Sequence, residues 1–142
     1  MVADRHHPLA LLGLFAFGLF AGPAAAESVP WTASLSSKDV VPPTNSAGKG
    51  QLDAVYDTVS KEFKWTLTYS GLSGPVTSVN FHGPAEQGKE GPILFPAGPA
   101  TASPIKGSLQ LSIPQADALK RGVYVEIQTS KFPGGEIRGE LK

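Results

Sequence analysis

The sequence predicts an all-β protein: a single antiparallel, Greek-key-like β-sandwich or barrel of about eight strands, with one short helix near 114–121. Two observations lead to this fold class. After an apolar N-terminal segment, apolar residues recur mostly at every second position, as in strands that bury one face. Glycine (16) and proline (13) are frequent among the 142 residues, which is typical of short strands joined by tight turns.

The first 26 residues have the pattern of an export signal. A polar, partly basic start at 5–7 precedes an apolar run at 9–21, and Ala24–Ala26 supplies small residues for a cleavage site. A helix that spans a bilayer needs about 20 apolar residues, more than this run provides. We therefore expect residues 1–26 to be a cleaved signal peptide, and 27–142 to be one β domain without a membrane span, periplasmic or secreted.

The clearest strand covers 62–69, where four apolar residues alternate with polar ones. The segment 51–56 alternates in the same way, and the loop 57–61 between the two segments has the length of a hairpin connection. Trp65 is expected in the core. Further strands are expected in six segments: 31–35, 79–82, 93–95, 108–113, 123–128 and 136–141. In the fourth of these, Leu109, Leu111 and Ile113 are predicted to face the core.

One helix is predicted after this strand. Pro114 fits the first helical turn, where its missing N–H does no harm. Asp117 lies towards the N-terminal end, Lys120 and Arg121 lie near the C-terminal end, and Gly122 suits the position after the helix.

Composition excludes several classes of function. The chain has no cysteine, which excludes disulfides and cysteine-ligated metal sites. It has 12 Lys+Arg against 12 Asp+Glu and no basic run, so we expect no nucleic-acid partner. We expect a monomer whose partner is a protein or a small ligand.

Several ordered motifs of the chain resemble those of the CHRD family, the domain that is also repeated in the animal protein chordin. They cover nearly all of 31–142 and lie at 31–35, 41–50, 64–76, 82–85, 103–108 and 132–141. The resemblance implies a small exported β-domain with no assigned reaction. Chordin's binding of an extracellular signalling protein belongs to a multidomain protein and is not carried over.

His82 is the only histidine in 27–142 and the first candidate for a site. By strand parity it shares a polar face with Asn80, while Glu126 and Gln128 share the polar face of another strand. If the strands are neighbours, the four residues form one polar patch. His82 is either a ligand or general base, or a hydrogen-bonded residue that fixes the turn into Gly83-Pro84. We favour the second reading, because a single imidazole without charged partners makes a weak site.

Arg138 lies between two acidic residues, Glu136 and Glu140, on one strand face. It is either a clamp for an anion or a carboxylate, or half of an exposed ion pair, which we favour. Glu126, Glu136 and Glu140 are expected on solvated strand faces. Tyr124 is expected either to be exposed for partner contact or to pack on a second sheet.

These residues favour a non-enzymatic binding or structural module without a cofactor. The alternative is a periplasmic copper- or zinc-type protein that binds one metal ion through His82, with Asn80, Glu126 and Gln128. The CHRD resemblance bears on this alternative, because family members commonly carry further histidines where this chain has Asn80 and Gln128. Amide side chains are weak ligands for such metals. A hydrolase built on scattered carboxylates ranks last.

Overall fold

The computed structural model describes residues 27–142, so the expected signal peptide at 1–26 lies outside the described residues. The described residues form eight strands and one helix: β1 (Ser28–Ser36), β2 (Lys49–Asp57), β3 (Glu62–Ser70), β4 (Val76–His82), β5 (Ile93–Pro96), β6 (Ile105–Gln110), α1 (Ile113–Arg121), β7 (Tyr124–Thr129) and β8 (Ile137–Glu140).

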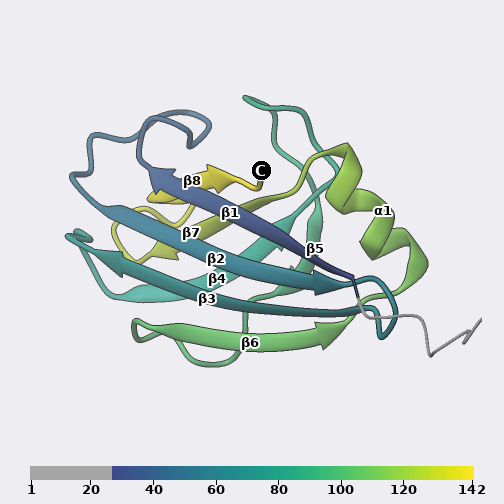
Figure 1. Ribbon diagram of the computed structural model, residues 1–142. Helices are drawn as coiled ribbons and strands as arrows, with labels where there is room; N and C mark the ends of the chain where they lie inside the picture. The colour runs from purple at the N-terminus through teal and green to yellow at the C-terminus, as the bar shows by residue number, and fades with distance from the viewer. Residues whose placement is uncertain (1–26) are drawn as a thin grey trace, which may run out of the picture.

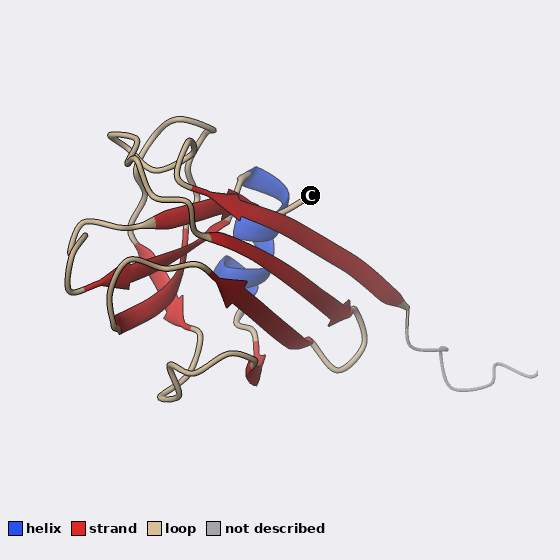
Figure 2. Ribbon diagram, turned by 90° about the vertical axis from the view of Figure 1, so that its left-hand side faces the viewer, coloured by secondary structure: helices blue, strands red, loops and turns tan. Residues whose placement is uncertain are grey.

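All eight strands belong to one antiparallel sheet in the order β5-β4-β7-β8-β1-β2-β3-β6. The sheet curls into a half-barrel, and α1 lies at the end where β1 begins (Figures 1 and 2). The all-β prediction with one short helix is confirmed, and the barrel-like arrangement describes it. Within 27–142, no helix is long and apolar enough to cross a bilayer.

The core fills the inner side of the curled sheet. Its centre is an aromatic cluster of Phe63, Trp65, Phe81 and Phe95, in which neighbouring ring centroids lie 4.8–6.1 Å apart. The Trp65 indole N–H donates to the carbonyl of Ala97 (3.0 Å), so its one polar group is satisfied inside the core. The predicted parity of β3 and β4 is therefore confirmed.

The hairpin between β2 and β3 also follows the prediction. The Asp57 carboxylate accepts hydrogen bonds from the backbone N–H groups of Val59 (2.8 Å) and Ser60 (2.9 Å). Lys61 closes the loop with a positive φ of 67°. A side chain that bonds its own backbone two and three residues on stabilises such a turn.

Helix α1 begins one residue earlier than predicted, and this corrects one core assignment. Ser112 caps the helix, because its side chain accepts from the Gln115 backbone N–H while the Gln115 side chain accepts from the Ser112 backbone N–H. Ile113 is thus the first helical residue and is 78% exposed, not a core residue of a strand. Pro114 favours this outcome, since it cannot donate to a β-ladder. Gly122 ends the helix with φ +114°.

Candidate functional site

The structure brings the predicted site residues onto three adjacent strands, β4, β7 and β8. Asn80 is in register with Glu126, and Glu126 is in register with Arg138. Gln128 lies beside Ser78, whose hydroxyl donates to the Gln128 side-chain oxygen. Because β4 and β7 are neighbours, these residues share the outer face of the sheet, as the strand parity required.

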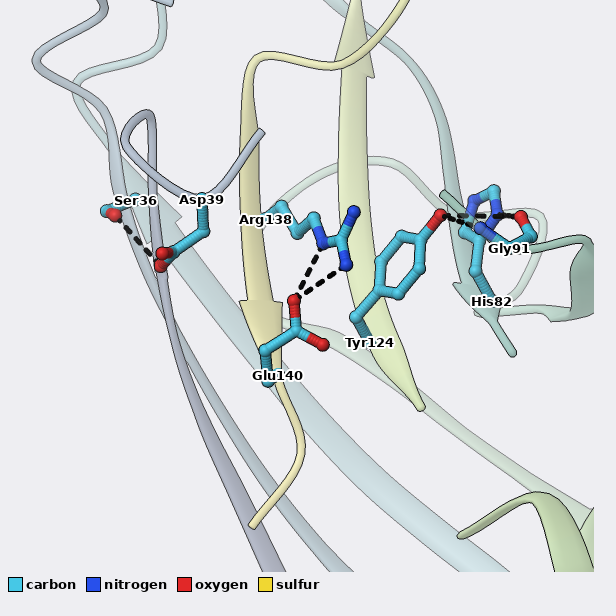
Figure 3. A network of polar contacts seen from close by, with 7 residues as sticks. All are labelled: Ser36, Asp39, His82, Gly91, Tyr124, Arg138 and Glu140. Atoms are coloured by element: carbon cyan, nitrogen blue, oxygen red, sulfur yellow. Dashed lines mark hydrogen bonds and ion pairs between the residues drawn. The ribbon is translucent and has the colours of Figure 1, made fainter. Parts of the chain in front are cut away.

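The centre of this face is a stack of three side chains. The Tyr124 ring lies parallel to the His82 imidazole, with 4.8 Å between centroids and 4° between planes. The Arg138 guanidinium carbon lies 3.4 Å from the Tyr124 ring centroid. Figure 3 shows the three groups side by side. A cation over a desolvated aromatic ring stabilises by about 2 kcal/mol.

Tyr124 is neither exposed nor packed on a second sheet, which corrects both expectations for this residue. It is 2% exposed, although it projects from the outer face of β7. Arg138 and His82 cover its ring, and its hydroxyl reaches Gly91 in the loop between β4 and β5. The outer face of the sheet is therefore covered by side chains and loops at this point.

Arg138 is fully buried, not half of an exposed pair. Its Nε donates to Glu140 Oε1 (2.8 Å), and its Nη2 lies 2.8 Å from the same oxygen without hydrogen-bond geometry. Glu140 is two residues ahead on the same strand, so the pair is not a cross-strand one. Nη1 has no partner among the described residues.

His82 holds the loop that follows its strand. Its Nδ1 lies 3.0 Å from the carbonyl oxygen of Gly91, a contact that places the ring proton on Nδ1. Nε2 is buried and has no partner in the described part of the chain. Burial lowers the pKa of His82, the Gly91 contact opposes this shift, and the charge of Arg138 adds to it. The imidazole is accordingly neutral at pH 7.

Tyr124 holds the same loop residue as His82. Its hydroxyl accepts from the Gly91 backbone N–H (3.0 Å) and lies 3.3 Å from the Gly91 carbonyl oxygen. Two stacked rings from adjacent strands thus meet at one backbone position. The loop 83–92 is fixed over the sheet by these contacts.

Glu126 is a buried carboxyl group and is not solvated as expected. It is 6% exposed, and burial raises its pKa to about 7, although Arg138 opposes the shift. Gly135 covers it so closely that a Cβ there would lie 2.6 Å from the Glu126 carboxyl carbon. Gly135 also has φ +123°, a conformation that favours glycine.

Glu136 is a second buried carboxyl group, and it too was expected to be solvated. It accepts hydrogen bonds from the Ser46 hydroxyl (2.6 Å), the Ser73 backbone N–H (2.8 Å) and the Thr129 hydroxyl (2.8 Å). Burial opposes ionisation, but these hydrogen bonds outweigh it and lower the pKa of Glu136. An ionised carboxylate therefore joins three loops that are distant in sequence.

Sequence reasoning missed this role of Glu136. One signal was present: Glu136, Ser46 and Ser73 each belong to a different CHRD-like motif, at 132–141, 41–50 and 64–76. Residues shared by separate motifs without a common reaction are expected to meet in the fold. Strand parity could not identify them, because parity states which face a residue is on and not what covers that face.

A groove of about 670 Å³ lies between the loops above this polar layer. It is next to the layer because Gly135 both lines the groove and covers Glu126. Glu90 and Lys131 supply opposite charges, and most of the other lining residues are apolar. The full lining, called the loop groove below, is Val40, Val41, Pro42, Pro43, Thr44, Asn45, Glu90, Lys131, Phe132, Pro133, Gly134 and Gly135.

The side chains on this face offer little to a metal ion. No group of three or more His, Asp or Glu side chains within 27–142 is placed to hold one. His82 Nε2 and the Glu126 carboxylate are the donors on this face best suited to a transition metal. Asn80 and Gln128 contribute only amides, which such metals bind weakly.

The comparisons with known proteins agree with the motifs. The CHRD domain family matches residues 31–141, nearly the whole described chain. No curated protein and no solved structure matches the chain. The matched range includes every strand that builds the polar layer and the loops over it. The chain therefore belongs to the CHRD domain family.

Proposed function

We propose that this CHRD-domain protein is an exported, non-enzymatic binding module whose partner, a protein or a small ligand, binds in the loop groove. The observation that carries the proposal is the anchoring of loops by buried polar side chains. Glu136 holds the segments around Ser46 and Ser73, and His82 and Tyr124 hold Gly91. A rigid sheet that fixes several loops is a common scaffold for recognition.

The non-enzymatic part of the proposal rests on how the ionisable groups are used. The Nδ1 proton of His82 is engaged by a backbone carbonyl, and Glu136 accepts three hydrogen bonds. Glu126 has a pKa near neutrality but lies beneath Gly135. A general base must come within hydrogen-bond reach of a substrate proton. These groups are occupied by the protein itself.

The binding role is tested with charge reversals in the loop groove. We expect a partner from the protein's own extracytoplasmic fraction to be retained by the wild type and lost by the Glu90→Lys/Lys131→Glu double variant, because both charges line the groove. Lys106→Glu is the control, an exposed lysine on β6 that does not line it. If all three proteins retain the same partners, or none, the loop groove is not the binding surface.

Export is tested by the mass of the chain expressed with its own N-terminus. Cleavage after Ala26 gives a protein that begins at Glu27 and is recovered from the periplasm or the medium. Recovery of the complete chain in the cytoplasm or membrane would contradict export.

The metal-binding alternative is retained because His82 Nε2 is buried without a partner, near Glu126. Elemental analysis of the purified protein decides it. Our proposal predicts no stoichiometric metal and no rise in melting temperature with added copper or zinc. Stoichiometric metal that disappears in His82→Ala would establish the alternative.

A further inference from the structure

A second groove lies at the other end of β1, between α1 and the inner face of the sheet. It has a volume of about 320 Å³ and is called the helix groove below. Ligand sites of about 300–1,000 Å³ are common in the mouths of β-barrels. The lining residues are Val29, Trp31, Tyr56, Thr58, Lys61, Leu111, Ser112, Ile113, Ala116, Asp117, Leu119 and Lys120.

The helix groove is an extension of the hydrophobic core that α1 does not close. Leu111 and Leu119 at its base are buried with the core. Val29 and Ile113 at its rim are 36% and 78% exposed. Exposed apolar side chains next to a hollow that leads to the core are typical of a site for an apolar ligand.

Trp31 places an unmatched hydrogen-bond donor at this groove. It lies on the inner side of β1, at the same parity as the core residues Ala33 and Leu35. Its indole Nε1 is buried and has no acceptor among the described residues. A buried N–H without a partner is unfavourable, and a ligand that carries an acceptor removes that cost.

The charges of the helix groove favour an anion. Lys61 and Lys120 line it, against the single carboxylate of Asp117. The Lys61 ammonium donates to the carbonyl of Thr58 (2.8 Å), which leaves two of its three N–H groups for a ligand. An acceptor-bearing anion would therefore satisfy both the lysines and the indole N–H.

We propose that the helix groove binds the free carboxylate of a single-chain fatty acid. The alkyl chain lies against Val29, Ile113 and Leu119, and the carboxylate accepts from Trp31 and faces the two lysines. This site is separate from the loop groove and does not depend on the function proposed there. Each part of the ligand answers a different feature of the groove: apolar lining, unmatched donor and excess positive charge.

The test uses decanoate as the probe, with the protein purified as the cell delivers it from the full-length gene. Isothermal titration calorimetry and tryptophan fluorescence measure binding. Decanoate is expected to bind, 1-decanol to bind about tenfold more weakly because it lacks the charge, and decylammonium not to bind. Equal binding of all three would mean apolar adsorption only and would overturn the carboxylate site, as would no binding of decanoate.

Two variants locate the site. Trp31→Phe keeps a ring but removes the N–H, and we expect decanoate to bind about tenfold more weakly. Ala116→Trp fills the groove without a change of charge, and we expect it to abolish binding. Ala102→Trp is the matched control on an exposed loop residue that does not line the groove, and its affinity should equal the wild type's.

The variants are first compared by circular dichroism and melting temperature. If Ala116→Trp does not fold, Trp31→Phe alone decides the question. Unchanged decanoate affinity in Trp31→Phe would overturn the assignment of the carboxylate to the indole N–H.

Discussion

Glu126 and Glu136 come from adjacent strands and have opposite charge preferences. Both are buried, and burial favours the neutral acid. Glu136 also accepts three hydrogen bonds, which favour its ionised form and lower its pKa. Glu126 has Arg138 as the main opposing influence, so burial prevails and its pKa rises to about 7. Local hydrogen bonding, not burial alone, decides which carboxyl group is charged.

Glu126 makes stability depend on pH. Its pKa is about 7 in the folded protein against a model value of 4.5. Between these values the folded state holds a proton that the unfolded state has lost, so the free energy of unfolding falls as pH rises. Glu126→Gln removes this dependence. We expect the variant to gain about 1–3 kcal/mol over the wild type at pH 8 relative to pH 4.

Urea denaturation at both pH values measures this gain. Other groups titrate in the same range, but they are common to both proteins and cancel in the difference. An identical stability difference between variant and wild type at pH 4 and pH 8 would show that Glu126 keeps an ordinary pKa.

Gly135 is required by its conformation and by its contact with Glu126. Gly135→Ala places a Cβ 2.6 Å from the Glu126 carboxyl carbon at φ +123°, and we expect a loss of about 2–4 kcal/mol in the free energy of unfolding. Gly134→Ala is the matched control, because nothing lies within 4 Å of a Cβ there. Equal stability of the two variants would mean that Gly135 does not pack on Glu126.

At the scale of elements, α1 depends on its cap. Ser112 accepts from the Gln115 backbone N–H, so Ser112→Ala leaves a helix donor unsatisfied. We expect it to lower the free energy of unfolding by about 1 kcal/mol in thermal or urea melts, and Ser112→Gly by only a few tenths. If alanine were as stable as serine, the cap would contribute nothing to α1.

The elements also show how much of the fold could be predicted. Alternation in 62–69 and 51–56 gave the β2–β3 hairpin and its core face, because apolar period and turn length agree there. The helix followed from Pro114 and Gly122. Ile113 was misassigned because an apolar residue continues the strand alternation, while the capping box at Ser112 begins the helix.

The candidate site was predicted only in part. Parity placed Asn80, His82 and Glu126 on one polar face, and the pairing of β4 with β7 joins them. The burial of Arg138 and Glu136 could not be predicted in this way. Alternation marks the side of a sheet away from the core, and it assumes that water covers that side, whereas here loops do.

At the scale of the whole molecule, the CHRD motifs meet in one polar layer. The motif at 132–141 supplies Glu136, and those at 41–50 and 64–76 supply its partners Ser46 and Ser73. The motif at 82–85 supplies His82, which lies beside Arg138 through Tyr124. The layer supports the loop groove near one end of β1, while the helix groove lies at the other.

Hydrogen exchange of Glu136→Gln tests this central claim most directly. The glutamine keeps the shape but puts an amide where a carboxylate accepted from Ser46 and Ser73 or from Thr129. Measured by mass spectrometry against the wild type, the amides of 42–48 and 71–75 should exchange at least tenfold faster, while those of β2 and β3 keep their protection. Unchanged exchange in those loops, or an equal rise throughout the chain, would contradict the account.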